Sequence, residues 1–174
     1  MRYLTVVRHA KARPAEPGAS DFDRPLSGRG RRQCAELREW AVDPRALGSF
    51  GPVTALVSSA ARTRETFERS FADTDFVAAV HYSELIYNGR RDVSAEDLLI
   101  DLSSVDPVTT SLLVVAHNPT VHELVASLAR DVPEELTQRG YPLGGAYVFE
   151  LREDQPIGLA RYPMVAKFIP VGDR

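Results

Sequence analysis

Short apolar runs that alternate with helix-like segments constrain the fold of this chain more than any other feature of its sequence. Residues 3–7, 53–57 and 112–116 have the length and the aliphatic composition of buried strands, and residues 76–80 and 147–151 are two further candidates. Strands that alternate with helices are typical of a mainly parallel sheet with helices on both faces. We therefore predict a three-layer α/β/α fold.

The segments between these runs carry the signals of helices and loops. Ser27 can cap a helix that continues to about residue 40, and a second helix is expected over residues 60–71. The segment from Ser94 to Asp97 has the pattern of a capping box. Asn118-Pro119 suits a helix start, because Asn can cap and Pro is tolerated at the first helical position. Residues 12–24 contain two prolines and a glycine and are predicted to form a surface loop.

Composition and charge exclude several classes of function. With 174 residues, 44% hydrophobic and 26% charged, the chain resembles an ordinary globular protein, and we expect one domain over residues 1–174. The formal net charge of −3 argues against a general nucleic-acid binder, which needs a basic face. The one cysteine, Cys34, cannot form an internal disulfide, and no apolar stretch has the length of a membrane span. We therefore predict a cytoplasmic protein with no nucleic-acid or membrane partner.

Polar residues directly follow three of the predicted strands. These residues are Arg8-His9, Ser58-Ser59 and His117-Asn118. In open α/β sheets, ligands bind beyond the carboxyl ends of the strands, so we expect the two histidines to meet at one edge of the sheet. Arg62, one helical turn after Ser58-Ser59, should reach the same edge.

These residue types fit phosphoryl transfer. Negative charge spreads over the equatorial phosphoryl oxygens, and the guanidinium groups of Arg8 and Arg62 can bind two oxygens at once. A neutral imidazole such as that of His9 can attack phosphorus at neutral pH. The second imidazole, that of His117, could then donate to the phosphoryl oxygens. Arg8, His9, Arg62 and His117 are therefore the candidate pocket.

The same residues resemble the motifs of a known family, the histidine phosphatase (phosphoglycerate mutase-like) superfamily. Arg8-His9-Ala10 resembles its Arg-His-Gly signature, and residues 58–62 with Thr66 resemble its Ser…Arg…Thr segment. Ala116-His117-Asn118-Pro119 resembles the segment of its second histidine, and Asp23-Arg24-Pro25-Leu26 is similar to the SixA-type phosphohistidine phosphatase branch. The resemblance covers roughly residues 1–130. It implies a phosphoglycerate mutase-like fold, a phosphohistidine intermediate on His9 that is then hydrolysed, and no metal or other cofactor.

Two positions, Ala10 and Glu84, bear on how closely the chain follows the pattern of this family. Ala10 stands where the family has Gly, which should cost little if the backbone φ there is negative. Glu84 lies where larger members carry a carboxylic acid that protonates the leaving oxygen, although it also fits an exposed glutamate after a strand. Small SixA-like members often lack this acid, and a P–N bond breaks readily once its imidazole is protonated. Glu84 is therefore a candidate general acid. If it has this role, P–O substrates are favoured; if it does not, P–N substrates are favoured.

The predicted function is a metal-independent phosphatase that hydrolyses phosphohistidine or small phosphomonoesters through His9. Its partner would be a phosphorylated protein or a small phosphate ester. One alternative is a non-catalytic phospho-ligand binder with the same fold, although binding alone needs no nucleophilic imidazole. The other is a phosphoglycerate mutase-type phosphotransferase, which would have to retain the phosphoenzyme and exclude water.

Overall fold

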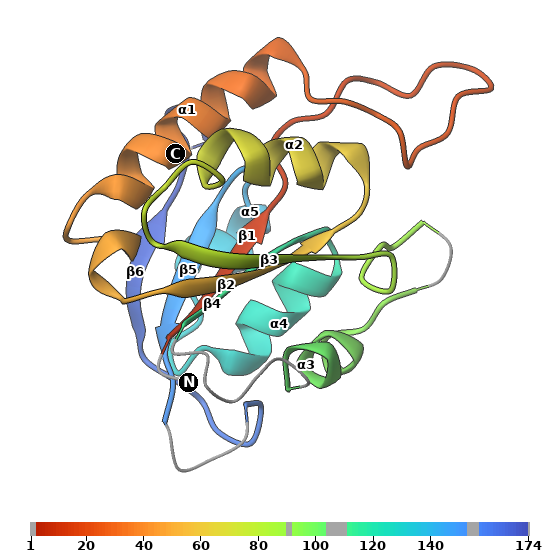
Figure 1. Ribbon diagram of the computed structural model, residues 1–174. Coiled ribbons are helices and arrows are strands. Elements are labelled where there is room, and N and C mark those ends of the chain that lie inside the picture. The colour runs from red at the N-terminus through yellow and green to blue at the C-terminus, as the bar shows by residue number, and fades with distance from the viewer. Residues whose placement is uncertain (1–2, 90–91, 104–110, 153–156, 174) are drawn as a thin grey trace.

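A six-stranded sheet with the strand order β3-β2-β4-β1-β5-β6 forms the centre of the computed structural model (Figure 1). The structure describes residues 3–89, 92–103, 111–152 and 157–173. The strands are β1 (Tyr3–Arg8), β2 (Val53–Ser58), β3 (Val77–Ser83), β4 (Ser111–Ala116), β5 (Ala146–Glu150) and β6 (Met164–Phe168).

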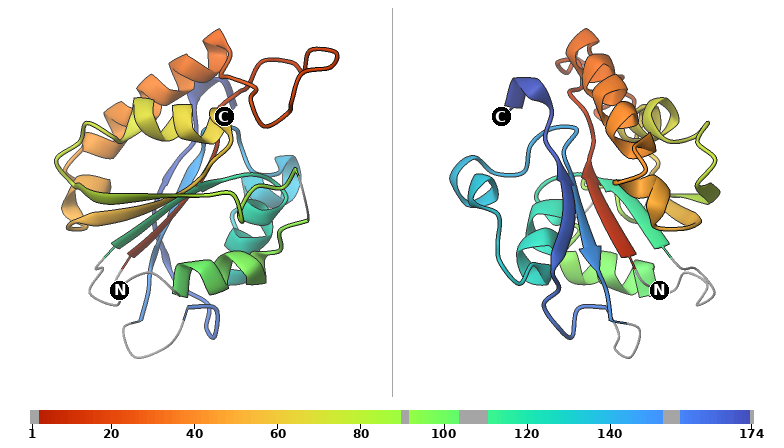
Figure 2. Two further views of the ribbon diagram at one scale, coloured as in Figure 1. Left: turned by 45° about the vertical axis from the view of Figure 1, so that its right-hand side comes forward. Right: turned by 90° about the vertical axis from the view of Figure 1, so that its left-hand side faces the viewer.

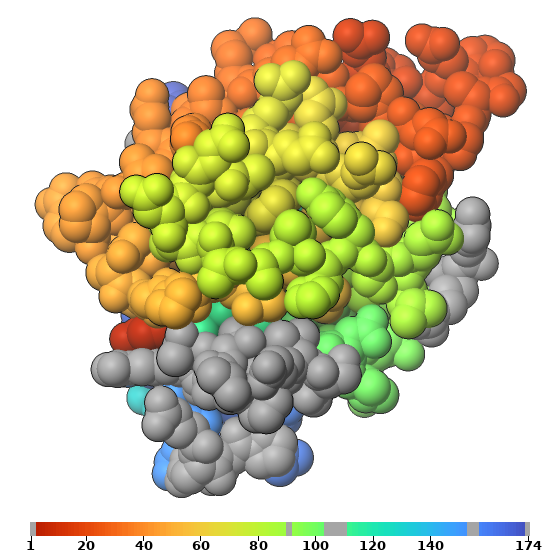
Figure 3. All heavy atoms as spheres, in the orientation of Figure 1, coloured from red at the N-terminus to blue at the C-terminus, as the bar shows by residue number. Residues whose placement is uncertain are grey.

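The first four strands of the chain are parallel to one another, as predicted. β4 lies between β1 and β2, and β2 also pairs with β3. β5 runs antiparallel to β1, and β6 antiparallel to β5. The sequence did not predict β6, because this edge strand is only partly buried and its apolar pattern is weak. Strand β3 forms the opposite edge and lies largely exposed, and its part of the chain covers much of the face seen in Figure 3.

Helices cover both faces of the sheet, which confirms the three-layer architecture (Figure 2). On one face lie α1 (Gly28–Val42) and α2 (Ala61–Ser70), which pack on a core that includes Val7. On the other face lie α3 (Ala95–Ser103), α4 (Thr120–Leu128) and α5 (Glu134–Arg139), which pack on a core that includes Val6. Because successive strand residues point to opposite faces, β1 supplies side chains to both cores, and its residues Leu4, Val6 and Val7 are fully buried. Two short 3₁₀ helices, η1 (Leu47–Ser49) and η2 (Val171–Asp173), complete the described elements.

The helix starts confirm two predictions and correct a third. The Ser27 side chain accepts a hydrogen bond from the Gly30 amide at 3.1 Å, so it caps α1. Ser94 and Asp97 form the reciprocal bonds of a capping box. The predicted cap at Asn118 is wrong, because Pro119 occupies the cap position of α4 and has no side-chain acceptor to offer. None of the helices in the described part of the chain is long and apolar enough to cross a membrane.

Helix α1 lies unusually close to the chain that follows β1. A Cβ atom at residue 30 would lie 2.2 Å from the Lys11 carbonyl oxygen, so only glycine fits there. The same carbonyl accepts hydrogen bonds from the Ser27 amide and hydroxyl, both at 2.9 Å. This contact fixes the path of the chain immediately after Arg8-His9, and hence the position of the candidate site.

Candidate active site

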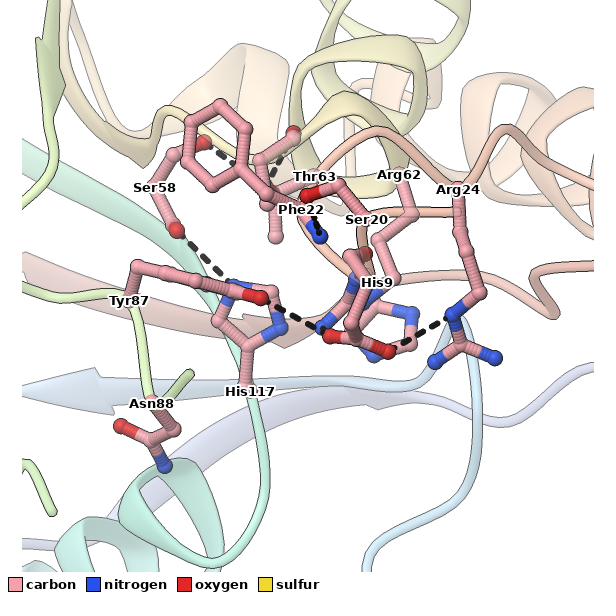
Figure 4. A network of polar contacts seen from close by, with 12 residues as sticks. His9, Ser20, Phe22, Arg24, Ser58, Arg62, Thr63, Tyr87, Asn88 and His117 are labelled. Atoms are coloured by element: carbon pink, nitrogen blue, oxygen red, sulfur yellow. Dashed lines mark hydrogen bonds and ion pairs between the residues drawn. The ribbon is translucent and has the colours of Figure 1, made fainter. Parts of the chain in front are cut away.

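The two predicted histidines meet at the carboxyl ends of the parallel strands. The His9 amide donates to the Ala116 carbonyl at 3.1 Å, so the pairing of β1 with β4 continues one residue beyond β1. The ring centroids of His9 and His117 lie 5.1 Å apart. Figure 4 shows both rings with Arg62 and Tyr87 around one space. His9, Arg62 and His117 therefore lie together at these strand ends, and Arg8 is close enough for its charge to lower the pKa of both rings.

The tautomer of His9 follows from its backbone neighbour. Its Nδ1 lies 2.8 Å from the Ala10 carbonyl oxygen. A carbonyl oxygen can only accept, so Nδ1 carries the proton and Nε2 keeps a free lone pair when the ring is neutral. Burial lowers the pKa of His9 to about 3; the Ala10 carbonyl opposes this shift, and the charges of Arg62 and Arg8 add to it. His9 is therefore neutral at pH 7 and has a nitrogen able to act as a nucleophile.

His117 is buried, and its ring makes one polar contact with the part of the chain that the structure describes. Its Nε2 lies 2.8 Å from the Ser58 hydroxyl oxygen, whereas its Nδ1 has no hydrogen-bond partner among the described residues. Burial lowers the pKa of His117 to about 2, and the charges of His9, Arg62 and Arg8 add to the effect. If the Ser58 hydroxyl donates to Nε2, the neutral ring carries its proton on Nδ1, where it can serve an incoming acceptor.

Arg62 is buried at the start of α2, with a relative exposure of 6%. Its Nη1 donates to the Asp21 carbonyl oxygen at 2.7 Å and its Nη2 to Asp21 Oδ2 at 3.0 Å. Its Nε is buried and has no hydrogen-bond partner in the described structure. The Tyr87 ring lies under this guanidinium at 5.7 Å and meets the His117 ring edge to face at 5.5 Å.

Arg8 is held by the loop that precedes β5. Its Nη1 donates to the Tyr141 carbonyl, and its amide donates to the Gly145 carbonyl at 3.1 Å. The Gly144 amide in turn lies 3.1 Å from the Arg8 carbonyl oxygen. Gly144 has a φ of +72°, which favours glycine, and a Cβ there would lie 3.2 Å from the Gln33 side chain. The loop that leads into the antiparallel strand β5 thus holds Arg8 in place, and with it the Arg8-His9-Ala10 motif.

Thr66 links the motif at the end of β1, which contains Ala10, to the motif at the start of α2, which contains Arg62. Its hydroxyl accepts from the Ala10 amide at 3.0 Å and donates to the Arg62 carbonyl at 2.6 Å. No non-glycine residue of the described chain has a positive φ, so Ala10 occupies the position of the family's glycine without backbone strain. The replacement of Gly by Ala is therefore structurally inexpensive, as expected.

Glu84 differs from the four pocket residues in its placement. It lies exposed in the turn after β3, where its carbonyl accepts from the Tyr87 amide at 3.2 Å. Tyr87, three residues later, is the buried side chain of this segment that reaches the pocket. The general-acid role of Glu84 stays a prediction.

Sequence reasoning missed two residues of the site, Asp21 and Tyr87. Asp21 lies in the predicted surface loop, and its carboxylate contacts Arg24, Arg62 and the Tyr87 hydroxyl. The spacing of Asp21 and Arg24, three residues apart, was the one available signal, and it is weak outside a helix. Within the described ranges, no group of three His, Cys, Asp or Glu side chains is placed to hold a metal ion. The site offers a neutral nucleophilic nitrogen surrounded by guanidinium groups, which suits an anionic, electrophilic group.

Comparison with known proteins agrees with this geometry, although no family model matches the chain. It is 33% identical over 129 residues to an uncharacterized protein of Mycobacterium tuberculosis strain H37Rv, covering 71% of this chain and 70% of that one. A structure from Agrobacterium tumefaciens, provisionally assigned as the phosphohistidine phosphatase SixA, is 26% identical with a TM-score of 0.78, covering 97% and 98% of the two chains. The protein histidine phosphatase SixA in complex with tungstate has the same fold, with 20% identity, a TM-score of 0.72 and 99% of each chain covered.

Proposed function

Because the chain belongs to the histidine phosphatase superfamily, in the branch of the SixA-type phosphohistidine phosphatases, we propose that it hydrolyses phosphohistidine through a phosphoryl intermediate on His9. The observation that carries the proposal is the free Nε2 of a neutral His9 beside Arg62 and His117. A site that only bound phosphate would need the cations but not a nitrogen with a fixed lone pair.

The reaction would proceed in two displacements. The His9 Nε2 lone pair forms an N–P bond while the bond from phosphorus to the leaving group breaks and its electron pair departs with that group. Arg8, Arg62 and the Nδ1–H of His117 donate to the phosphoryl oxygens as charge develops on them. A water oxygen then bonds to phosphorus, the N–P bond breaks, and the lone pair returns to Nε2. The water proton passes to solvent or phosphate, and inorganic phosphate leaves.

The acid–base properties of the pocket favour leaving groups that need little help from the protein. The carboxylate that contacts Arg62 is that of Asp21. Its partial burial raises its pKa, but the Tyr87 hydrogen bond and the charges of Arg62 and Arg24 outweigh burial and lower the pKa below the usual value. An ionised carboxylate cannot protonate an alkoxide. The imidazole of phosphohistidine, once protonated by solvent, leaves as a neutral group. We therefore propose P–N substrates, with aryl phosphates as accessible surrogates, ahead of alkyl phosphates.

The test is turnover of a histidine-phosphorylated protein and of p-nitrophenyl phosphate, each with and without EDTA. We expect turnover of both to survive chelation, since we propose a mechanism that uses no metal. Rapid quenching should also trap acid-labile, base-stable phosphate on the protein. Binding of phosphate without turnover of either substrate would favour the non-catalytic alternative. Loss of turnover with EDTA, restored by one divalent ion, would exclude the proposed mechanism.

A further inference from the structure

One carboxylate links three segments of the site. Asp21 Oδ1 lies 2.8 Å from Arg24 Nε, and Asp21 Oδ2 lies 3.0 Å from Arg62 Nη2 and 2.9 Å from the Tyr87 hydroxyl. These partners come from the loop after β1, from α2 and from the segment after β3. Figure 4 shows Arg24, Arg62 and Tyr87 arranged around the same region as His9.

The backbone around Asp21 is fixed independently of these contacts. The Phe22 carbonyl accepts from the Ala61 amide at 2.9 Å, at the start of α2, where the cap residue Ala60 has no side-chain acceptor. The loop is also closed at its base by a bridge between Ala12 and Leu26. Asp21 is therefore presented to Arg62 by a loop that is attached to the same helix.

The contacts of Arg62 leave one side of its guanidinium for another ligand. A guanidinium has five N–H donors in a plane. Asp21 binds one on Nη1, through its carbonyl, and one on Nη2, through its carboxylate. The Nε–H is buried and has no partner among the described residues, although a buried unpaired donor is costly. Of the arginines, Arg62 also lowers the pKa of His9 most, as expected for a charge close to the nucleophile.

We propose that Asp21 is a positioning residue, which holds Arg62 by its two Nη groups so that the Nε side binds the phosphoryl group beside His9. The proposal rests on the proposed function and adds a residue to its machinery. Tyr87 acts through Asp21 as well, because its hydroxyl donates to the carboxylate that holds Arg62. The opposite view is that the carboxylate occupies the place of the phosphoryl group and competes with it. The two views predict opposite changes in phosphate affinity and in kcat/KM when the Asp21 carboxylate is removed.

The test compares Asp21→Ala and Asp21→Asn with Asp23→Asn, an exposed carboxylate two residues away in the same loop. We measure kcat and KM for p-nitrophenyl phosphate, and the Kd of inorganic phosphate by calorimetry. Asp21→Ala should lower kcat/KM by about 10- to 100-fold, because a displaced catalytic group is that costly. It should also weaken phosphate binding. Asp21→Asn keeps an acceptor for Nη2 and should recover part of the loss, whereas Asp23→Asn should stay within about twofold of wild type.

A double-mutant cycle separates positioning from general loop stability. Tyr87→Phe keeps the ring against Arg62 and His117 and removes only the hydroxyl. It should lower kcat/KM by about three- to tenfold in the wild-type background, and by less than about twofold in the Asp21→Ala background. Thermal melting of each variant identifies one that fails to fold, and in that case Asp21→Asn and Tyr87→Phe still carry the test.

Unchanged or tighter phosphate binding by the Asp21 variants, together with unchanged or higher kcat/KM, would overturn the positioning role. Additive losses in the cycle would overturn the role of the Tyr87 hydroxyl. If the wild type binds phosphate but turns over no substrate, it is the proposed function that fails. The phosphate affinities then still decide whether Asp21 orients Arg62.

Discussion

The two ends of the parallel strands differ in whether the buried polar atoms near them have hydrogen-bond partners. At the amino ends of β2 and β3, a cavity of about 520 Å³ is lined by residues that include Arg38, Asp73 and Phe76. It contains no histidine, and Arg38 donates to the Asp73 carbonyl at 3.4 Å. At the carboxyl ends, buried His117 Nδ1 and Arg62 Nε have no hydrogen-bond partner among the described residues.

Cavity volume is therefore a poor guide to the site in this protein. A buried polar atom without a partner costs about 1–3 kcal/mol, so such atoms are rare unless a ligand satisfies them. Charge agrees with this assignment, since the pKa of each histidine at the carboxyl end is lowered by burial and by neighbouring positive charge. We therefore expect substitutions at the two ends to have very different effects on turnover.

The largest effect is expected from His9→Ala. It should lower turnover by about 10⁴-fold or more, because it removes the attacking nitrogen, and acid-labile phosphate should no longer be trapped on the protein. The fold should persist, since within the described part of the chain the polar contact of the ring is with the neighbouring Ala10 carbonyl. Arg38→Ala, at the other end of the strands, is the matched control and should keep wild-type turnover. Appreciable activity of His9→Ala would show that His9 is not the nucleophile.

His117→Gln should have the next largest effect. Loss of one donor to a developing oxyanion commonly costs about 10²–10³-fold in kcat, and glutamine cannot place a donor where Nδ1 lies. Single-turnover kinetics, which report the chemical steps directly, provide the measurement. The control is His81→Gln on the exposed edge strand β3, which should be neutral. Equal activities of the two variants would remove His117 from the mechanism.

The buried histidines should also make the fold sensitive to acid. Their folded pKa values, about 3 for His9 and about 2 for His117, lie below the unfolded value of 6.5. The unfolded chain therefore binds more protons below pH 6.5. The stability due to the neutral rings is fully present above that pH and is lost as the pH falls toward 3. Each ring should contribute on the order of 1 kcal/mol per pH unit to this loss.

Urea unfolding at pH 7 and pH 5 measures this dependence. The free energy of unfolding of His117→Gln should fall less between the two pH values than that of the wild type, because one of the two rings has been removed. His81→Gln should behave as the wild type does. An identical pH dependence for wild type and His117→Gln would contradict the lowered pKa of His117.

The smallest effect is expected from Glu84→Gln. If Glu84 were the general acid, hydrolysis of alkyl phosphates would slow by about 10²–10⁴-fold and that of phosphohistidine only slightly. Because Glu84 lies exposed in the turn after β3, we expect changes of less than about threefold for both substrates. A p-nitrophenyl ester is unsuitable here, since its leaving group needs little protonation. A selective loss of alkyl phosphate hydrolysis would establish Glu84 as the acid.

The features of this protein that could be predicted from its sequence are those that depend on residues close together in the chain. Strand ends followed by polar residues predicted that His9, Arg62 and His117 would share one edge, because parallel strands deliver their carboxyl ends to the same side. The Ser27 cap and the Ser94–Asp97 box were likewise predictable, since each joins atoms three residues apart.

The other features depend on contacts between segments that are distant in the sequence, so they could not be predicted from local patterns. The ion pair of Asp21 with Arg62 spans 41 positions, and the bond of Tyr87 with Asp21 spans 66. Such contacts leave no local period or spacing in the sequence, because they exist only once the loop after β1 is attached to α2. The antiparallel direction of β5 and the pairing of β6 with β5 likewise depend on contacts between segments that are distant in the sequence. In each case the packing of distant segments, rather than local preference, selected among conformations that the sequence left open.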